Sequence, residues 1–271
     1  MARLVLVRDL QAPLGPQLDA EQSASDASDT LNEASVEQGY DPMARISIVV
    51  RKRNIIGWTG FDMLVADKKV CECIDPIQAS SVLSADTTAL EAVEIFGSTS
   101  HHFFFVLHHN RVTGTLHYGD LFSLPVKLCL FALTLDLEDS ALRLALIWAR
   151  DSWQCLTEER RKRGEAVYEL RYKHSPHSEG GPYDQLLGCT TFCDKGNILK
   201  KCGLVPEISG KKIDSIFSRA ERVRNSCAHT NPDNTGNMAL VERADLCQFI
   251  EEIQRAIGLI ESMLETPPHR K

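Results

Sequence analysis

Two periods of hydrophobic and polar positions divide the chain. Through about residue 124, short runs of β-branched and aromatic residues, such as residues 46–50 and 103–107, predict strands separated by tight turns and short helices. From residue 126 onward the apolar positions recur at helical spacing, and the pattern predicts no strand. We therefore expect an α+β protein with one domain over residues 1–124 and an all-α domain over residues 125–271.

The first domain contains an internal repeat. A shift of 57 positions places residues 46–57 on residues 103–114, and each copy has a strand, a tight turn and a second strand that ends on glycine. The turns are expected at Arg53-Asn54 and Asn110-Arg111. Only glycine lets a backbone or a ligand approach the end of that second strand closely.

Two further correspondences complete the repeat. Residues 7–13 open the first copy as residues 70–76 open the second, and Asp29-Thr30 falls on Asp86-Thr87. Residues 18–29 are rich in Asp, Ser and Ala, so we expect them to form a mobile loop that lengthens the first copy.

The repeat resembles the tandem cystathionine-β-synthase-type (CBS) pair, a βαββα module that occurs twice in many sensor proteins. Residues 83–92 are similar to the strand-to-helix segment of that family, and residues 114–121 are similar to the segment after its second hairpin. The resemblance implies an adenosine-nucleotide ligand, which is contacted by a Thr or Ser and by an Asp that follow the glycine. The alternative is a pair with a purely structural or dimerising role.

Five positions of this chain correspond to the nucleotide-binding positions that the resemblance implies. In the second copy they are Gly114, His117 and Asp120, with His117 in place of the usual Thr or Ser. In the first copy they are Thr59 and Asp62, each one residue early relative to the second copy. The expected regulatory ligand is an adenine nucleotide.

The second domain is expected to be a bundle of four or five helices. An apolar run begins after Leu124-Pro125, and either one helix or two helices broken near residues 136–140 would fit it. A loop is expected at residues 175–182, where glycine and proline are concentrated. Further helices are predicted at residues 184–202, 212–228 and 240–264.

A charged residue interrupts the apolar stripe of the helix over residues 212–228. At 100° per residue, Arg224 lies about 20° round from Ile213, inside the stripe. A charge there is costly unless it is paired, so we expect it to face a cleft, a partner chain or a carboxylate, such as Glu221 or one on a neighbouring helix. Asn225 and His229 are four residues apart and share the adjoining face. A helix-end histidine bonded to carbonyl groups is the simpler alternative for His229.

Arg224, Asn225 and His229 together resemble the signature of HEPN (higher eukaryote and prokaryote nucleotide-binding) domains, and residues 191–200 resemble the helix that precedes it. Active members are dimeric, metal-independent endoribonucleases. The resemblance implies that Arg224 holds the scissile phosphate, that His229 transfers protons and that Asn225 positions either the phosphate or the histidine. Because the 2′-hydroxyl group of the RNA attacks, catalysis needs no cofactor. The expected partners are RNA, a second copy of the chain and a regulatory nucleotide or an antitoxin, in a defence or toxin-like role.

Charge bears on the predicted binding of RNA, and cysteine content bears on where the protein acts. The net charge of −7 belongs to the first domain, which argues against general coating of nucleic acid, although local clusters such as residues 160–163 can still bind phosphate. Nine cysteines without a regular framework, and no long apolar run at the N-terminus, favour reduced thiols and a cytoplasmic protein. The apolar stretch over residues 126–137 is too short to span a bilayer.

A structural zinc site is an open alternative near the predicted loop. His174, His177, Cys189 and Cys193 have suitable types and spacings, although the two cysteines equally fit buried thiols on one helix face. No metal is expected in catalysis. The function that the sequence favours is an endoribonuclease controlled by a ligand-sensing first domain. The alternative is a non-catalytic regulator that binds an adenine nucleotide through the first domain and RNA or protein through the second.

Overall fold

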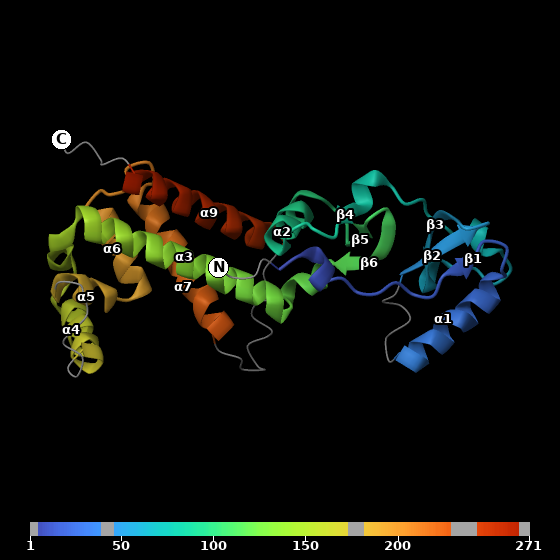
Figure 1. Cartoon of the computed structure of the whole chain (residues 1–271), viewed down its shortest axis with the longest axis horizontal. Helices are drawn as coiled ribbons and strands as arrows, with labels where there is room; N and C mark the ends of the chain where they lie inside the picture. Colours follow the sequence, from blue (N-terminus) through green and yellow to red (C-terminus); the bar gives the residue numbers. More distant parts are fainter. Residues whose placement is uncertain (1–4, 39–45, 173–181, 229–242, 266–271) are drawn as a thin grey trace. The chain divides into compact units, whose positions relative to one another are not determined.

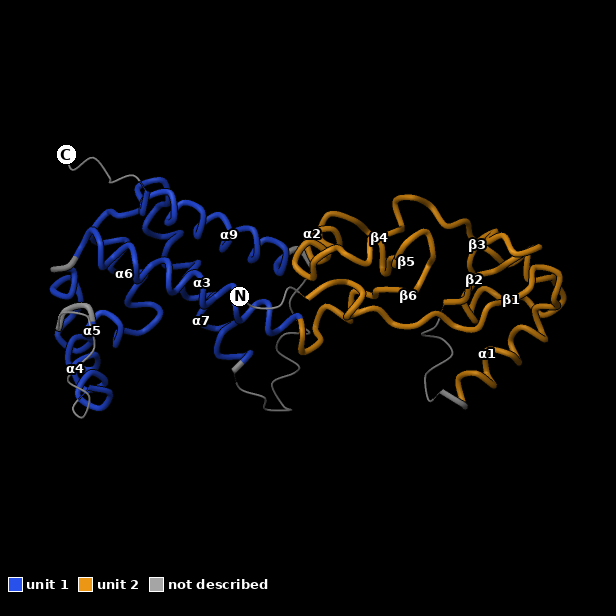
Figure 2. The backbone as a smooth tube through the Cα atoms, in the orientation of Figure 1, with its two compact units in different colours: residues 1–2, 126–271 blue, residues 3–125 orange. Residues whose placement is uncertain are grey.

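The computed structural model describes residues 5–38, 46–172, 182–228 and 243–265. The chain divides into two compact units, drawn in different colours in Figure 2. The sheet unit comprises residues 3–125 and contains both β-sheets, and the helical unit comprises residues 1–2 and 126–271 and contains the long helices (Figure 1). None of the described helices has the length and apolar character that crossing a bilayer requires.

Two three-stranded sheets of the same design make up the sheet unit. In each sheet the first strand runs parallel to the second, and the second and third strands form an antiparallel hairpin. A helix connects the first strand to the second, and a short 3-10 helix follows the third. The first sheet and its helices are β1 (Leu18–Asp19), α1 (Ala24–Gln38), β2 (Ile46–Arg51), β3 (Asn54–Gly60) and η3 (Phe61–Met63). The second set is β4 (Val82–Ser84), α2 (Ala89–Ser98), β5 (Phe103–His108), β6 (Arg111–His117) and η6 (Tyr118–Phe122).

The two hairpins have the same register, which confirms the repeat over the strands. Val49 pairs with Gly57 as Val106 pairs with Gly114, and a β-bulge follows at the same place in both ladders. The turns lie one residue earlier than predicted. Their central residues have positive φ angles, 51° and 69° at Lys52 and Arg53 and 47° and 63° at His109 and Asn110. Two residues with positive φ match the right-handed twist of the flanking strands.

The prediction of a mobile loop over residues 18–29 is wrong. Leu18 pairs with Val49 just as Leu83 pairs with Val106, so β1 and the start of α1 correspond to β4 and the start of α2. The alignment of Asp29-Thr30 with Asp86-Thr87 is therefore wrong as well. The segment resembles a loop in composition because its core side chains are small. Even so, Leu18, Ala20, Ala24 and Ala27 are all at most 1% exposed.

The segments that open the two copies are exchanged between the sheets. The first opening segment is residues 6–12 with η1 (Val7–Asp9), and the second is residues 69–75 with η4 (Val70–Glu72). Ala12 in the first segment pairs with Thr115 of β6, and Asp75 in the second pairs with Trp58 of β3. Each segment thus adds to the sheet of the other copy, so the two copies fold as one body.

Glycine in the middle of each third strand makes this exchange possible, and the prediction that the strand ends on this glycine is wrong. A Cβ atom on Gly114 would lie 2.5 Å from the Ala12 carbonyl oxygen, and one on Gly57 would lie 2.6 Å from the Asp75 carbonyl oxygen. Both distances are far below van der Waals contact, so only glycine fits. The predicted close approach at these glycines is therefore made by backbone of the opening segments.

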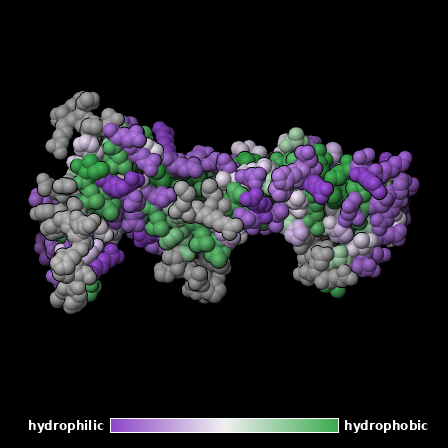
Figure 3. Space-filling view, viewed as in Figure 1, coloured by the Kyte–Doolittle hydropathy of each residue, from purple (hydrophilic) through white to green (hydrophobic). Residues whose placement is uncertain are grey.

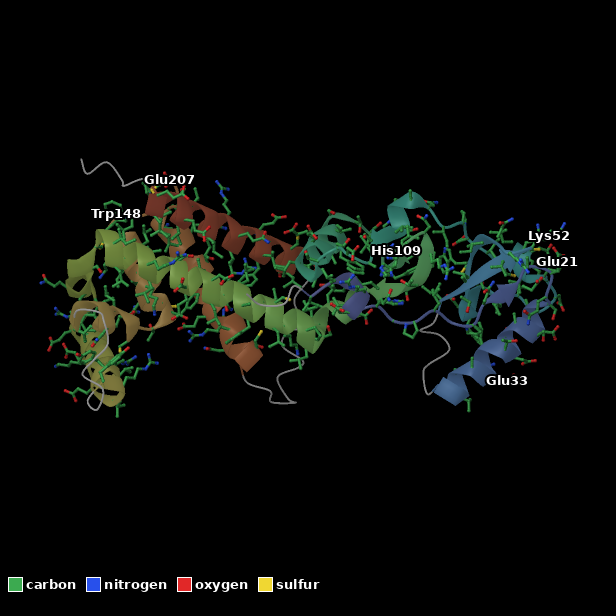
Figure 4. All side chains as sticks on the ribbon, in the orientation of Figure 1. Glu21, Glu33, Lys52, His109, Trp148 and Glu207 are labelled. Atoms are coloured by element: carbon green, nitrogen blue, oxygen red, sulfur yellow. The ribbon has the colours of Figure 1, made fainter. Side chains whose placement is uncertain are left out.

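The sheet unit carries charged side chains at the end formed by β1–β3. Hydrophilic residues dominate the visible surface there (Figure 3). Glu21 accepts bonds from Arg51 at 2.9 Å and from Lys69 at 2.8 Å. Figure 4 places Glu21 and Lys52 at this same end, with His109 at the turn of the other hairpin. The hydrogen bond and charge of Lys69, together with Arg51, hold the pKa of Glu21 below its ordinary value.

The helical unit contains no strand among its described residues. Because Thr191 caps a new helix with a capping box that Asp194 completes, the predicted helix over residues 184–202 is two helices. The apolar run after Pro125 is a single helix, which settles the alternative that the sequence left open. The helices are α3 (Leu124–Trp148), η7 (Arg150–Cys155), α4 (Glu158–Tyr172), α5 (Pro182–Gly188), α6 (Phe192–Lys201), α7 (Gly210–Ala228) and α9 (Arg243–Glu265).

Candidate functional site

Arg224 lies one turn before the end of α7 and has the partner that its position in the apolar stripe requires. Its Nη1 donates to Oε2 of Glu138 on α3 at 3.0 Å, and its Cζ lies 5.5 Å from the ring centroid of Phe192 on α6. The carboxylate thus comes from a neighbouring helix and not from Glu221. Three helices together hold the guanidinium group.

The same carboxylate also binds a second cation. Lys195 Nζ donates to Glu138 Oε1 at 2.9 Å and to the Thr190 carbonyl oxygen at 2.9 Å. Its side chain is 3% exposed, whereas those of Arg224 and Glu138 are 28% and 21% exposed. We call Arg224, Glu138 and Lys195 the Arg224 cluster. One carboxylate and two basic side chains give the cluster a formal charge of about +1.

The position of α6 brings Lys195 to the cluster. A Cβ atom on Gly196 would lie 2.6 Å from Cγ of Phe217, so glycine allows α6 to pack closely against α7. Asp194 is 5% exposed and accepts a bond of 2.6 Å from Arg160 on α4. Sequence reasoning missed Glu138 and Lys195. The signal that could have found them is the one that identified Arg224, a charged residue among the apolar positions of a helix.

The other predicted residues of the helical unit have different surroundings or lie outside the described residues. Asn225 is exposed on α7, and His229 lies outside the described residues. Glu221 accepts a bond of 3.0 Å from the thiol of Cys193. Burial and this bond to Glu221 raise the pKa of Cys193 to about 11.

The zinc alternative is not decided by the described residues. His174 and His177 lie outside them. Within the described part of the chain, no group of three or more His, Cys, Asp or Glu side chains could hold a metal ion. Cys189 is buried, and that burial raises the pKa of its thiol, as expected for a packed cysteine.

In the second copy of the sheet unit, His117 and Asp120 meet at the start of η6. Asp120 Oδ2 accepts a bond of 2.8 Å from the His117 backbone N–H group. The His117 ring lies against Phe103 with centroids 5.6 Å apart, and its Nε2 is 3.3 Å from Thr115 Oγ1. Both side chains are half-buried. The space beside Gly114, in contrast, is filled by the backbone of Ala12.

The first copy has different residues at the same places. Gly60 pairs with Ile46 as His117 pairs with Phe103, which confirms that Thr59 and Asp62 are one residue early. Thr59 is fully buried and donates to the Gly60 carbonyl oxygen at 3.3 Å, whereas Asp62 is exposed. The Gly60 N–H group is 3.3 Å from the sulfur of Met63, which takes the place of Asp120. Of the two copies, only the second therefore has a carboxylate that accepts from the backbone N–H group at the start of this turn, because Asp62 lies one residue early.

Aromatic side chains of both copies meet beside this turn. Trp58 of β3 lies edge-on to Phe103 of β5, with ring centroids 5.1 Å apart, and Phe103 in turn contacts His117. All three rings are half-buried. The junction between the copies thus presents aromatic surface next to a carboxylate.

No family model matches the chain. No curated protein matches it either. Solved structures of CBS-domain proteins align with its N-terminal part. One is CBSX2 in complex with AMP, with a TM-score of 0.35, 17% identity, and coverage of 46% of this chain and 98% of that one.

Two further structures align with the chain at similar levels. The CBS domain of the bacterial CNNM/CorC family Mg2+ transporter in complex with ATP has a TM-score of 0.32, 15% identity, and coverage of 43% and 84%. The CBS domains of a transcriptional regulator from Streptococcus pneumoniae have a TM-score of 0.33, 10% identity, and coverage of 44% and 98%. The equivalence of the two copies in this chain rests on their own strand order and register.

Proposed function

We propose that the sheet unit binds an adenine nucleotide and that this binding regulates the helical unit. The observation that carries the proposal is the junction of the two copies, where Trp58, Phe103 and His117 gather beside Asp120. Aromatic rings stack on purine bases, and a carboxylate accepts hydrogen bonds from ribose hydroxyl groups. The sheet unit thus offers both kinds of group that an adenosine requires.

The difference between the copies implies one nucleotide per chain. Gly60 and Met63 stand where the second copy has His117 and Asp120, so the first copy has no imidazole ring and no carboxylate at these two positions. Titration calorimetry with AMP, ADP and ATP is expected to give a single site per chain. A second site of equal affinity would contradict this assignment.

Asp120 provides the sharpest test of nucleotide binding. In Asp120→Asn the amide oxygen can still accept the His117 N–H bond, so the turn persists while the charge is lost. Loss of a charged acceptor is expected to raise the dissociation constant about tenfold. Asp62→Asn is the matched control because Asp62 is exposed at the corresponding turn of the first copy. Absence of binding by the wild type, or equal weakening by both variants, would overturn the proposal.

A second candidate function is RNA cleavage by the helical unit. The bond to Glu138 uses one of the five N–H donors of the Arg224 guanidinium group, and the others can contact a phosphate. In the reaction, the 2′-oxygen attacks the phosphorus while His229 or a second base takes its proton, and the 5′-oxygen leaves after protonation. The products are a 2′,3′-cyclic phosphate and a 5′-hydroxyl group. The HEPN resemblance implies that this site, with Asn225, is completed in a dimer.

Cleavage of RNA in the presence of EDTA tests this candidate. Arg224→Ala and His229→Ala are each expected to lower the rate about a hundredfold or more, because each removes charge stabilisation or proton transfer. Arg222→Ala is the matched control, since Arg222 is exposed on the same helix. If EDTA abolishes cleavage, or if Arg224→Ala cleaves like the control, the helical unit is not this kind of ribonuclease. RNA binding without cleavage would support the non-catalytic regulator instead.

A further inference from the structure

In the Arg224 cluster, one carboxylate binds two cations that differ in their exposure to solvent. Glu138 binds Arg224 through one oxygen and Lys195 through the other, at 3.0 and 2.9 Å. Lys195 is almost completely buried, whereas more than a quarter of the Arg224 side chain is exposed. Solvent, or a ligand in it, can therefore reach the Arg224 side chain but not the Lys195 side chain.

Lys195 determines how much positive charge the exposed guanidinium offers. With only Glu138 as partner, Arg224 would belong to a neutral pair, and the carboxylate would repel an approaching phosphate about as strongly as the guanidinium attracts it. The buried ammonium group offsets the charge of that carboxylate. Glu138 accepts from a single N–H group of Arg224, so it directs the guanidinium while other donors remain for a ligand.

We propose that Glu138 and Lys195 are positioning residues for the binding of a phosphodiester at Arg224. Glu138 orients the guanidinium group, and Lys195 offsets the carboxylate charge so that the guanidinium keeps its affinity for an anion. The Phe192 ring, which lies under Arg224 Cζ, also contributes to holding the guanidinium group in place. This proposal rests on the RNA role of the helical unit given above.

A second cluster in the same unit supplies a matched control. Glu252 on α9 binds Lys212 and, at 3.3 Å, Arg219, both on α7. The residue types are the same, and Arg219 is 25% exposed, close to the value for Arg224. In this cluster, however, the lysine is half-exposed, and Arg219 also donates to the Asp245 carbonyl oxygen. Variants of this Glu252 cluster therefore distinguish general effects of charge on RNA binding from effects that are specific to Arg224.

The test measures binding of the full-length chain to a fluorescein-labelled 2′-O-methyl RNA oligonucleotide, which has no attacking hydroxyl group. Arg224→Ala is expected to weaken binding and to reduce the slope of log affinity against log salt concentration by about one. Lys195→Met is expected to weaken binding about tenfold because it leaves the Glu138 charge unopposed. Glu138→Gln/Lys195→Met is expected to bind within about threefold of the wild type, since neither charge remains. Lys212→Met, the control, is expected to leave the affinity unchanged.

The rescue in the double variant separates positioning from a structural role. If Lys195 only stabilises the fold, the double variant stays as weak as Lys195→Met, and the proposal is overturned. Thermal melting shows which variants are folded. If Lys195→Met alone does not fold, Glu138→Gln and the double variant still decide. Each keeps an amide oxygen that can accept from Arg224 and removes the carboxylate charge, so a tenfold loss of affinity in either contradicts the proposal. If the wild type binds no RNA, the RNA role itself fails; if only Arg224→Ala weakens binding, the RNA role stands and the positioning role fails.

Discussion

Burial controls the chemistry of individual cysteines in this protein. Burial and a hydrogen bond to Glu221 raise the pKa of Cys193 to about 11. Burial, together with the neighbouring thiol of Cys155 at 3.6 Å, raises the pKa of Cys202 to about 11 as well. Because the thiolate is the reactive form, both side chains are suited to packing and not to nucleophilic catalysis.

Alkylation rates test this prediction at the residue scale. At neutral pH, Cys193 and Cys202 are expected to react with iodoacetamide about a hundredfold more slowly in the folded protein than in the chain unfolded in urea. Mass spectrometry of peptides at successive times gives the rate for each cysteine. Glu221→Gln is expected to speed the reaction of Cys193 but not that of Cys202, since only Cys193 bonds to Glu221. Equal rates in folded and unfolded protein would contradict the raised pKa values.

The opening segments are the elements that join the two copies of the sheet unit. Ala12 and Thr115 exchange backbone hydrogen bonds of 2.7 and 2.9 Å, and Trp58 and Asp75 exchange two bonds of 2.9 Å. These bonds connect each hairpin to the segment that opens the other copy of the repeat. The stability of each hairpin therefore depends on a segment that begins the other copy.

A single methyl group at Gly114 tests this dependence. In Gly114→Ala the new Cβ atom would lie 2.5 Å from the Ala12 carbonyl oxygen, so the segment must move. We expect a loss of about 2 kcal/mol in the free energy of unfolding, measured by urea denaturation. Gly119→Ala is the control, because nothing lies within 4 Å of its Cβ position. If the control variant loses as much stability as Gly114→Ala, the contact with Ala12 is not the cause.

At the scale of the whole molecule, the sheet unit and the helical unit each have a core of their own. One buried cluster gathers Leu18, Val49 and Val70 of the sheet unit, and another gathers Trp153, Leu187 and Ile198 of the helical unit. Separate cores predict separate unfolding transitions. A nucleotide bound to the sheet unit is expected to raise the temperature of the sheet unit's transition, by an amount that follows its affinity.

Glu252 partly determines how the unfolding transition of the helical unit depends on pH. Burial raises the pKa of Glu252, but bonds from Lys212 and Gln248 and the charges of Lys212 and Arg219 outweigh it and hold the pKa below its ordinary value. A carboxyl group with a lowered pKa stabilises the folded state above its ordinary pKa, and this stabilisation is lost as the pH falls through the folded-state value. At pH 7, Glu252→Gln is expected to destabilise the helical unit by about 1 kcal/mol.

Calorimetry at several pH values checks this expectation. The difference between the wild type and Glu252→Gln is expected to persist from pH 7 to about pH 5 and to disappear only as the pH falls through the lowered folded-state pKa of Glu252. Only the transition of the helical unit is expected to change. A difference that is independent of pH would show that the ionised carboxylate is not responsible.

Local patterns in the sequence determine much of the secondary structure of this protein. The two hairpins, their common register and the change to helical spacing after residue 125 follow from periods of two and 3.6 residues, which depend only on near neighbours. The position of Arg224 in an apolar stripe predicts that it needs a partner, and the structure confirms it. The turns differ by one residue, because the choice of central residues depends on the twist of the paired strands.

Only the tertiary structure decides which distant residues meet. The small side chains of residues 18–27 hide a strand and a helix until the sheet and the second opening segment pack against them. The exchange of the opening segments, and the choice of Glu138 and Lys195 as neighbours of Arg224, likewise join residues far apart in the sequence. Such contacts depend on how whole elements pack, because no local period records which face of one helix or sheet will cover another.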